Sequence, residues 1–239
     1  TMNYILFDAS RDSLKPLTYI RPVCDIRIGI LTIREKWEKY LGDKTSTITE
    51  NYLSAKYPTA HSEEMMLING SICPTPSLVE EIKNLKVGQA LVSGNNVIAM
   101  YKTKEQFLSD EDSTQEVSFE GEFIKITNPW DIFALNDKAL REDFKLLTQG
   151  RKSAALSDTN RVLGKENIFV EEGAEVEFAV LNAKEGPIYI GKDAQIMEGS
   201  VVRGPFAMCE HSVLKMASKI YGATTLGPYV KVGGEVSNV

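Results

Sequence analysis

The C-terminal part of the chain carries an apolar residue at every sixth position. From residue 190 onward these positions hold Ile190, Ile196, Val202, Met208, Leu214, Ile220, Leu226 and Val232. Neither an α-helix, with its period of about 3.6 residues, nor a strand, with its period of two, produces this spacing. A fixed six-residue repeat is typical of a β-helix, in which each hexad forms one side of a coil and its leading apolar residue points inward. We therefore predict a hexapeptide-repeat left-handed β-helix.

The repeat changes frame near its start and stops within a hexad. Val170 and Val176 form an earlier apolar pair that is two residues out of phase with the later series. The shift predicts a loop around residues 182–187. Because the hexads run to Val239 without a polar cap, we expect that the chain is a truncated part of a longer protein. A partner subunit that covers the last coil is the alternative.

The first 150 residues alternate between strand and helix patterns. A buried strand is predicted over Asn3–Asp8, and a helix over Leu31–Leu41, where Thr32 and Glu35 have the spacing of a capping box. Further strands are expected at Thr45–Glu50, Met65–Asn69 and Phe123–Thr127, a hairpin at Ala90–Tyr101, and helices from Pro76 to Leu85 and from Asn128 to Leu147. The alternation predicts a mainly parallel α/β domain over residues 1–150, followed by the β-helix over 151–239. Ligands of such sheets bind at the carboxyl ends of the strands, which directs attention to the loop after Asp8.

Composition narrows the possible functions. The net charge of −6 and the isoelectric point near 5.2 argue against a nucleic-acid partner. The three cysteines lie far apart in the sequence and predict reduced, buried thiols rather than disulfides. No segment has the length and apolarity of a signal peptide or a membrane span, so we expect a cytoplasmic protein.

The loop over residues 9–29 is locally basic. It holds Arg11, Lys15, Arg21 and Arg27 against only two acidic residues. One interpretation is a solvated loop that Pro16 and Pro22 stiffen. The other is a phosphate-binding loop, because arginines bind phosphate oxygens in a bidentate manner and the following helix N-terminus favours negative charge.

The run Pro16-Leu17-Thr18, two residues, then Arg21-Pro22 resembles the signature of the sugar-1-phosphate nucleotidyltransferases. Asn128-Pro129-Trp130-Asp131 also resembles that group, and a β-helix after such a domain is the layout of the bifunctional uridyltransferase/acetyltransferases that make UDP-N-acetylglucosamine. The resemblance covers the whole chain. It implies a Rossmann-like nucleotidyltransferase-type sheet domain, nucleotidyl transfer from a nucleoside triphosphate (NTP) to a sugar-1-phosphate, and Mg²⁺ as cofactor.

The resemblance also implies roles for particular residues. It assigns catalytic roles to Lys15, Arg21 and Arg27, and substrate-binding roles to Arg11, Thr18, Asn69, Gly70 and Asn128. The chain departs from the family pattern at three places. The glycines of the phosphate loop are replaced by residues 9–13, the lysine after Arg-Pro is Val23, and the metal-binding aspartate is Ser71. The enzyme is the first interpretation, because the loop and the β-helix agree. Since nucleotidyl transfer depends on charge neutralisation, these departures keep open the alternative of a non-catalytic regulatory or oligomerisation protein that binds a sugar phosphate or a nucleotide.

The β-helix suggests a second activity. Hexapeptide β-helices often belong to acyltransferases that use a histidine base, and acetyl-CoA is a cofactor to consider for the full-length protein. The candidates are His211, with Lys215 and Lys219 for the phosphates of the coenzyme, although a surface histidine and regularly spaced lysines are also ordinary features of a soluble β-helix. The acyltransferase histidine of the family lies beyond residue 239. We expect a homo-oligomer, and a trimer through the β-helix is one such assembly. Besides the enzyme and the non-catalytic binding protein, the third interpretation is a purely structural oligomerisation module.

Overall fold

The computed structural model describes residues 2–109 and 114–239. They form two compact units. The first comprises Thr1–Ile26 and Leu31–Pro129, and the second comprises Arg27–Ile30 and Trp130–Val239. Residues 130–150, which the sequence patterns place in the first domain, therefore pack with the second unit.

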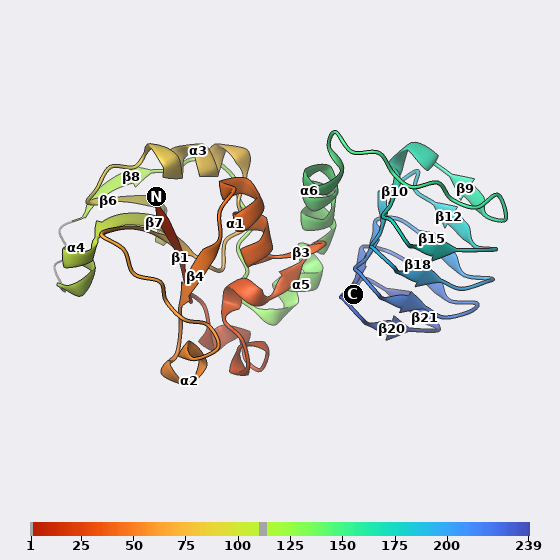
Figure 1. The fold of residues 1–239 in the computed structure, drawn as a ribbon, viewed down its shortest axis with the longest axis horizontal. Coiled ribbons are helices and arrows are strands. Elements are labelled where there is room, and N and C mark those ends of the chain that lie inside the picture. Colours follow the sequence, from red (N-terminus) through yellow and green to blue (C-terminus); the bar gives the residue numbers. More distant parts are fainter. Residues whose placement is uncertain (1, 110–113) are drawn as a thin grey trace. The chain divides into compact units, whose positions relative to one another are not determined.

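A six-stranded sheet forms the centre of the first unit, with the order β4-β1-β5-β7-β6-β8 (Figure 1). Its strands are β1 (Asn3–Phe7), β4 (Thr45–Ile48), β5 (Glu64–Asn69), β6 (Gln89–Ser93), β7 (Asn96–Thr103) and β8 (Gln115–Ser118). β1 pairs in parallel with β4 and β5, and β6 pairs in parallel with β8, whereas β7 is antiparallel to β5 and β6. The sheet is thus mixed. The predicted first strand and the predicted hairpin are confirmed.

The helices of the first unit begin and end at the residues that cap them. They are α1 (Ile33–Leu41), α2 (Asn51–Ser54), α3 (Pro76–Asn84) and α4 (Lys104–Leu108), and the short strand β3 (Leu31–Thr32) precedes α1. The predicted capping box is present, since the Thr32 hydroxyl accepts from the Glu35 amide and the Glu35 carboxylate accepts from the Thr32 amide. Gly42 ends α1 at φ 72°, a left-handed conformation that glycine adopts without a side-chain clash.

Two predicted elements were wrong. Residues 123–127 do not form a strand of the sheet but make an isolated bridge, Ile72 to Lys125, and the backbone of residues 71–73 bonds to this segment. One edge strand of the sheet is β8, which the sequence did not indicate. The predicted long helix is divided into α5 (Pro129–Ala134) and α6 (Asn136–Thr148). Leu135 leaves helical geometry there, at φ −101° and ψ 1°, and the next side chain, Asn136, is buried.

The second unit is the predicted left-handed β-helix, with three parallel sheets (Figure 1). Their orders are β10-β13-β16-β19, β11-β14-β17-β20 and β21-β18-β15-β12-β9. The strands are β9 (Arg161–Leu163), β10 (Ile168–Val170), β11 (Glu175–Val176), β12 (Val180–Asn182), β13 (Ile188–Ile190), β14 (Gln195–Ile196), β15 (Val201–Arg203), β16 (Phe206–Met208), β17 (Val213–Leu214), β18 (Lys219–Tyr221), β19 (Thr224–Leu226), β20 (Lys231–Val232) and β21 (Glu235–Ser237). A 3₁₀ turn, η4 (Lys165–Asn167), lies between β9 and β10.

The register of the coils explains the change of frame in the sequence. Val170 pairs with Ile190, Ile190 with Met208, and Met208 with Leu226. The first step is therefore two residues longer than the following ones, and the extra residues lie between β12 and β13, where residues 184–186 form a bend. The loop predicted for residues 182–187 is confirmed.

One side of the β-helix is covered by residues of its own unit. α6 contributes Leu140 to a cluster with Phe169, Tyr189 and Ala207, which point outward from β10, β13 and β16. The segment Arg27–Ile30, which contains β2 (Arg27–Ile28), joins this unit through buried polar side chains. Asn136 Oδ1 accepts from the Gly29 amide at 2.7 Å and Asp143 Oδ2 from the Ile30 amide at 2.8 Å.

Candidate functional site

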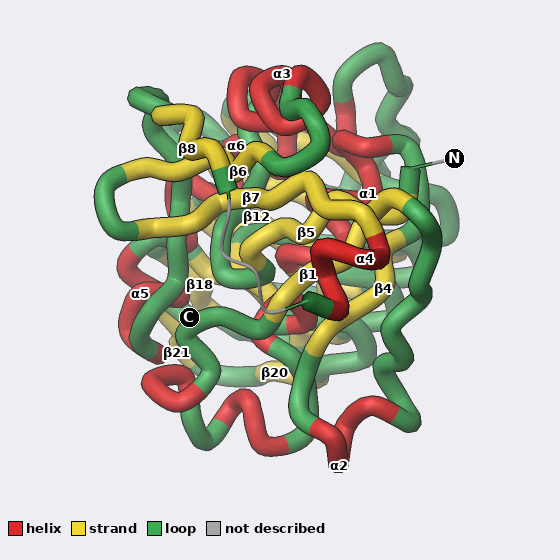
Figure 2. Tube along the Cα trace, turned by 90° about the vertical axis from the view of Figure 1, so that its left-hand side faces the viewer, coloured by secondary structure: helices red, strands yellow, loops and turns green. Residues whose placement is uncertain are grey.

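An open groove of about 560 Å³ lies at the carboxyl ends of β1 and β4. Figure 2 shows these strands side by side, with α2 beyond the end of β4. The lining is mostly polar and consists of Asp8, Ser10, Arg11, Asp12, Ser13, Ile48, Thr49 and Glu50. The predicted site loop therefore borders a groove at the sheet edge where α/β proteins bind ligands.

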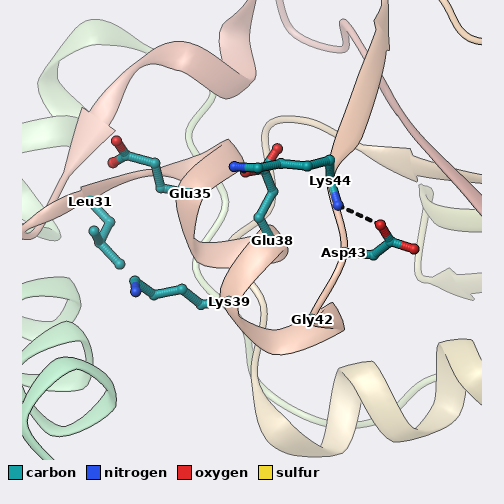
Figure 3. A pocket seen from close by; sticks show the side chains of 7 residues that line it. All are labelled: Leu31, Glu35, Glu38, Lys39, Gly42, Asp43 and Lys44. Atoms are coloured by element: carbon teal, nitrogen blue, oxygen red, sulfur yellow. Dashed lines mark hydrogen bonds and ion pairs between the residues drawn. The ribbon is translucent and has the colours of Figure 1, made fainter.

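A second hollow, of about 610 Å³, lies beside α1 and is lined by Leu31, Glu35, Glu38, Lys39, Gly42, Asp43 and Lys44 (Figure 3). Two of its charged groups pair with each other, since Lys44 Nζ lies 2.7 Å from Glu38 Oε2. It is at the amino end of β4 and contains none of the predicted site residues. We therefore take the groove at the carboxyl ends as the candidate site.

Asp8, the first residue after β1, holds the groove together. Its carboxylate accepts from Arg11 Nη1 at 2.8 Å, from Thr49 Oγ1 at 2.6 Å and from the Val23 amide at 2.6 Å. The carboxylate thus joins both ends of the loop to the end of β4. Sequence reasoning missed this role, although a polar residue directly after a buried parallel strand is a signal that could have found it.

Arg11, a predicted substrate-binding residue, points into the protein and is 8% exposed. Besides Asp8, its guanidinium donates to the Arg21 carbonyl at 3.2 Å, to the Thr18 carbonyl and to the Tyr52 hydroxyl at 2.6 Å. The side chain is therefore a structural centre of the loop, and its predicted contact with substrate stays a prediction.

The loop folds as three short 3₁₀ turns, η1 (Asp12–Leu14), η2 (Leu17–Tyr19) and η3 (Val23–Asp25). Thr18, a predicted substrate-binding residue, is fully buried, and its hydroxyl donates to the Arg11 carbonyl at 2.9 Å. Because Arg11 donates in return to the Thr18 carbonyl, the two residues close the loop on itself. Ser13 Oγ donates to the Thr127 carbonyl at 2.5 Å and fixes the loop to the segment before α5.

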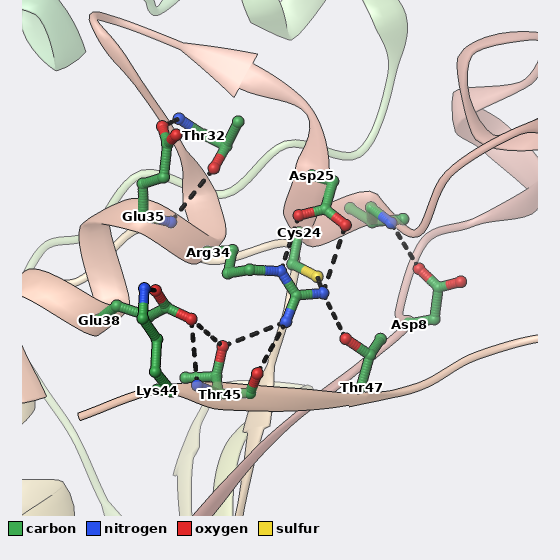
Figure 4. A network of polar contacts seen from close by, with 11 residues as sticks. Asp8, Cys24, Asp25, Thr32, Arg34, Glu35, Glu38, Lys44, Thr45 and Thr47 are labelled. Atoms are coloured by element: carbon green, nitrogen blue, oxygen red, sulfur yellow. Dashed lines mark hydrogen bonds and ion pairs between the residues drawn. The ribbon is translucent and has the colours of Figure 1, made fainter. Parts of the chain in front are cut away.

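A second, half-buried polar network holds the far end of the loop (Figure 4). Arg34 of α1 lies with Nε 2.7 Å from Asp25 Oδ1, and it also donates to Thr45 Oγ1 at 3.2 Å and to Thr47 Oγ1. Arg34 Nη2 lies 3.3 Å from Cys24 Sγ. Burial raises the pKa of the Cys24 thiol to about 12, so this cysteine remains a neutral part of the network.

Two of the three predicted catalytic residues, Lys15 and Arg21, are exposed on this loop. Lys15 Nζ forms an ion pair with Asp12 Oδ1 at 2.7 Å. The carbonyl of Arg21 is held by Arg11, while its side chain extends from the loop surface. Both cations thus belong to the unit that contains the groove.

Arg27, the third predicted catalytic residue, belongs to the other unit. Its Nη1 donates to the Ile30 carbonyl at 2.5 Å and lies 3.7 Å from Cys209 Sγ. The structure therefore does not bring Arg27 into one cluster with Lys15 and Arg21 within a single unit.

Hydrogen bonds hold the end of β5 against its neighbouring strands, and they are made by Asn69, Gly70 and Ser71. Asn69 Oδ1 accepts from the Ser71 amide at 3.0 Å and the Ser71 hydroxyl at 2.6 Å, and Asn69 Nδ2 donates to the Val97 carbonyl at 3.0 Å. The Gly70 amide donates to the Phe7 carbonyl at 2.9 Å. A Cβ atom added at Gly70 would lie only 2.9 Å from the same oxygen, so a larger residue does not fit there without a shift. Asn128, the last residue of the predicted set, is half-buried directly before α5.

These groups do not fit the expected Mg²⁺ ion. Ser71 stands where the family has a metal-binding aspartate, and its hydroxyl is buried and donates to Asn69. Both carboxylate oxygens of Asp8 already accept hydrogen bonds. Within residues 2–109 and 114–239, no group of three or more Asp, Glu, His or Cys side chains could hold a metal. Any Mg²⁺ would depend on the phosphate oxygens of a nucleotide and on one or two carboxylates.

His211, the candidate acyltransferase base, lies at a turn of the β-helix with φ 56°. Its ring stacks on Tyr229 with 4.8 Å between ring centroids, and its Nε2 lies 3.8 Å from Asp193 Oδ2. Lys219 pairs with Glu235 at 3.8 Å, and Lys215 is exposed. The geometry leaves the predicted acyl-transfer and coenzyme-binding roles as predictions.

Three general findings complete the description of the site. No helix in the described part of the chain is long and apolar enough to cross a membrane. A family model described as sugar nucleotidyl transferase matches residues 4–152, a range that includes the whole groove and the loop around it. Among curated proteins, none matches the chain.

Proposed function

We propose that this chain, which belongs to the sugar nucleotidyl transferase family, transfers a nucleotidyl group from an NTP to a sugar-1-phosphate. In this reaction an oxygen of the sugar phosphate forms a bond to the α-phosphorus, the bond from that phosphorus to the β-phosphate oxygen breaks, and pyrophosphate leaves. The observation that carries the proposal is the groove at the carboxyl ends of β1 and β4, within the region that matches the family.

Lys15 and Arg21 are the cations that we expect to meet the phosphates. Both are exposed on the loop that borders the groove. Positive groups held near the reacting phosphates stabilise the charge that develops during transfer. Since Arg11 is buried against Asp8, its contribution is to hold the loop in place.

The finer assignment follows the family likeness. UTP and N-acetylglucosamine-1-phosphate are the first substrate pair to test, with Mg²⁺ supplied in solution. The β-helix supports an associated acyl transfer with acetyl-CoA in a longer protein, and assembly as a homo-oligomer, such as a trimer. His211 beside Asp193 is the residue that we would examine for that second activity.

A second candidate function is binding of a sugar phosphate or nucleotide without transfer. The specific observation in its favour is the buried Ser71–Asn69 hydrogen bond at the position where the family holds its metal. Val23, which replaces the family lysine, is also fully buried and brings no charge. Such a protein would regulate sugar-nucleotide synthesis by binding alone.

The test measures binding and turnover separately. Isothermal titration with UTP, ATP and dTTP in the presence of Mg²⁺, and with N-acetylglucosamine-1-phosphate and glucose-1-phosphate, detects binding. Pyrophosphate release from a nucleotide and a sugar phosphate detects transfer. Binding with pyrophosphate release supports the enzyme, and binding without release supports the regulator. If none of these nucleotides or sugar phosphates binds, both proposals fail and the oligomerisation module remains.

Arg21→Ala tests the phosphate contact. Loss of a charge-assisted hydrogen bond weakens NTP binding by about 1–2 kcal/mol, which is roughly 5- to 30-fold in Kd. Arg203→Ala is the matched control, because Arg203 is an exposed arginine on the outer face of β15 in the other unit. Equal affinities of the two variants would remove Arg21 from the site.

A further inference from the structure

Tyr52 is an exposed aromatic residue beside the groove. It lies in α2, two residues after Glu50, which lines the groove at the end of β4. Its side chain is 63% exposed. Tyr52 does not itself line the groove, but its hydroxyl bonds to Arg11 and it follows Glu50 closely, and both of these residues do line it. An exposed ring next to a polar groove offers a flat apolar surface on which a planar ligand can stack.

The ring of Tyr52 is anchored from inside the protein. Its hydroxyl accepts from Arg11 Nη2 at 2.6 Å, and Arg11 in turn is held by Asp8 at 2.8 Å. Since Arg11 is itself buried, the tyrosine is tied to a rigid group. A ligand that stacks on this ring would lose less conformational entropy of the protein than one that stacks on a freely rotating side chain.

The anchor leaves the faces of the ring accessible. Arg11 Cζ lies 5.7 Å from the ring centroid, while Arg11 Nη2 is within hydrogen-bond distance of the hydroxyl. A guanidinium stacked on the ring face would be closer, at roughly the 3.5–4 Å of a carbon–carbon contact. The guanidinium therefore lies at the hydroxyl end of Tyr52 and does not cover either face.

The remaining lining of the groove fits a heterocycle better than an apolar partner. Ile48 is its one aliphatic lining residue, and the others include the carboxylates of Asp12 and Glu50. A nucleobase presents a flat face for stacking and polar N–H groups on its edge, which carboxylates accept. Lys15 and Arg21, on the same loop, would then meet the phosphates.

We propose that Tyr52 is the stacking platform for the base of the nucleotide that the groove binds. This inference rests on the proposed nucleotide-binding function and assigns the base to the Tyr52 side of the groove. Arg11 is the positioning residue that presents the ring. Because every base has a flat face, stacking contributes to affinity for purine and pyrimidine nucleotides alike.

The experiment compares ligands with and without a base. Isothermal titration of the full chain with UTP, ATP and tripolyphosphate is carried out on the wild type, Tyr52→Ala and Tyr52→Phe. We expect Tyr52→Ala to raise the Kd of UTP and ATP by about 5- to 150-fold, the range of ~1–3 kcal/mol per stacked base. The Kd of tripolyphosphate should be unchanged. Tyr52→Phe keeps the ring but loses the charge-assisted hydrogen bond from Arg11, so its Kd for UTP should lie between those of the wild type and Tyr52→Ala, with the Kd of tripolyphosphate unchanged.

Tyr221→Ala is the matched control, since Tyr221 is also an exposed tyrosine with a hydrogen-bonded hydroxyl, 45% exposed, but lies on β18 in the other unit. It should bind UTP as the wild type does. A spectroscopic arm uses Tyr52→Trp, whose added indole emission should be quenched by UTP but not by tripolyphosphate.

Each alternative outcome is distinct. Equal losses of UTP and tripolyphosphate affinity in Tyr52→Ala would show an indirect effect through Arg11 and would overturn the stacking role. Unchanged UTP affinity in Tyr52→Ala, with pyrophosphate release intact, would overturn the stacking role and leave the proposed function standing. A wild type that binds neither UTP, ATP nor tripolyphosphate would overturn both.

Discussion

Buried polar side chains are used differently in the β-helix and in the loop that borders the groove. In the β-helix, Ser212 Oγ donates to the Cys209 carbonyl at 2.6 Å and Ser218 Oγ to the Lys215 carbonyl at 2.5 Å. Each bond spans three residues within one turn. In the loop, Asp8 meets Thr49, a residue 41 positions away. The β-helix therefore satisfies its buried hydroxyls with carbonyls three residues away in the same turn, again and again. The loop depends on side chains from strands that only folding brings together.

The interiors of the β-helix and of the first unit also differ in whether their contacts repeat. The β-helix stacks equivalent residues of successive coils, as in Ile188, Phe206 and Thr224, which are aligned in register. The first unit closes its core with single, non-equivalent contacts, such as Trp37 Nε1, which donates to the Ile72 carbonyl at 2.8 Å. A variant in the stack should therefore disturb one coil and its neighbours, and a variant in the loop should disturb the groove.

The largest expected effect is that of Phe206→Ala. Phe206 is fully buried in the stack, and truncation of a buried phenylalanine costs about 4 kcal/mol because it removes apolar contacts and leaves a cavity. Urea unfolding monitored by hydrogen exchange of β-helix amides measures the loss. Tyr221→Ala, which removes an aromatic ring on the outer face of β18 that is 45% exposed, is the control and should cost much less. Similar losses for both variants would contradict the inward position of Phe206.

Asp8→Ala should produce the next largest effect, and it should be confined to the first unit. The change leaves the buried Arg11 without its counter-charge, which costs about 3 kcal/mol. Hydrogen exchange should increase in the loop and at the end of β4 but not in the β-helix. Asp12→Ala is the matched control, since Asp12 is exposed and its removal should change stability little. Uniform destabilisation of both units would show that Asp8 is not a local tie.

Cys24 makes the stability of the loop region depend on alkaline pH. Burial raises the pKa of its thiol from 9.0 to about 12. The folded state thus favours the neutral thiol, and this contribution is complete below pH 9 and is lost between pH 9 and about pH 12. The slope is about 1.4 kcal/mol per pH unit. Urea unfolding of the wild type and Cys24→Ala at pH 8.5, 9.5 and 10.5 should give a steeper decline for the wild type. Parallel declines would argue against a buried neutral thiol.

The smallest expected effects have opposite signs within the β-helix. Ser212→Ala removes a satisfied buried hydroxyl and should cost about 1 kcal/mol. Thr224 is equally buried, but its hydroxyl has no hydrogen-bond partner among the described residues. Thr224→Val should therefore be neutral or stabilising by about 1 kcal/mol, because an apolar group replaces an unsatisfied polar one. Thermal unfolding of both variants checks the signs, and a loss of stability in Thr224→Val would show that its hydroxyl is bonded.

Local signals predicted much of the fold and less of the site. The hexads, the capping box at Thr32 and Glu35, and the first strand are confirmed because each depends on residues a few positions apart. The strand expected at residues 123–127 was wrong because its partner is a loop rather than a sheet edge. The long helix was wrong at Leu135, where the chain turns so that Asn136 reaches the Gly29 amide.

The candidate site shows the same limit. The loop was located by its basic residues and its family likeness, and its place beside a groove at the strand ends is what the rule for α/β sheets predicts. The sequence pattern did not predict which side chains of the loop point inward and which point to solvent. Arg11 and Arg21 look equivalent in the sequence, yet one is buried against Asp8 and the other is exposed. Arg34 and Tyr52 carried no periodic or motif signal that separated them from ordinary surface residues, and the signal of Asp8 was only its place directly after a buried strand.

The sequence by itself determined the β-helix, because an inward apolar residue at each sixth position is a requirement that every coil meets with its own residues. It also determined where the loop lies in the chain and which family it resembles. Only the tertiary structure decided which charges of that loop are held inside. Arg11 and Asp8 are only three residues apart, but their ion pair is buried because the chain around β1 and β4 excludes water from it, and that condition is set by contacts between residues far apart in the sequence.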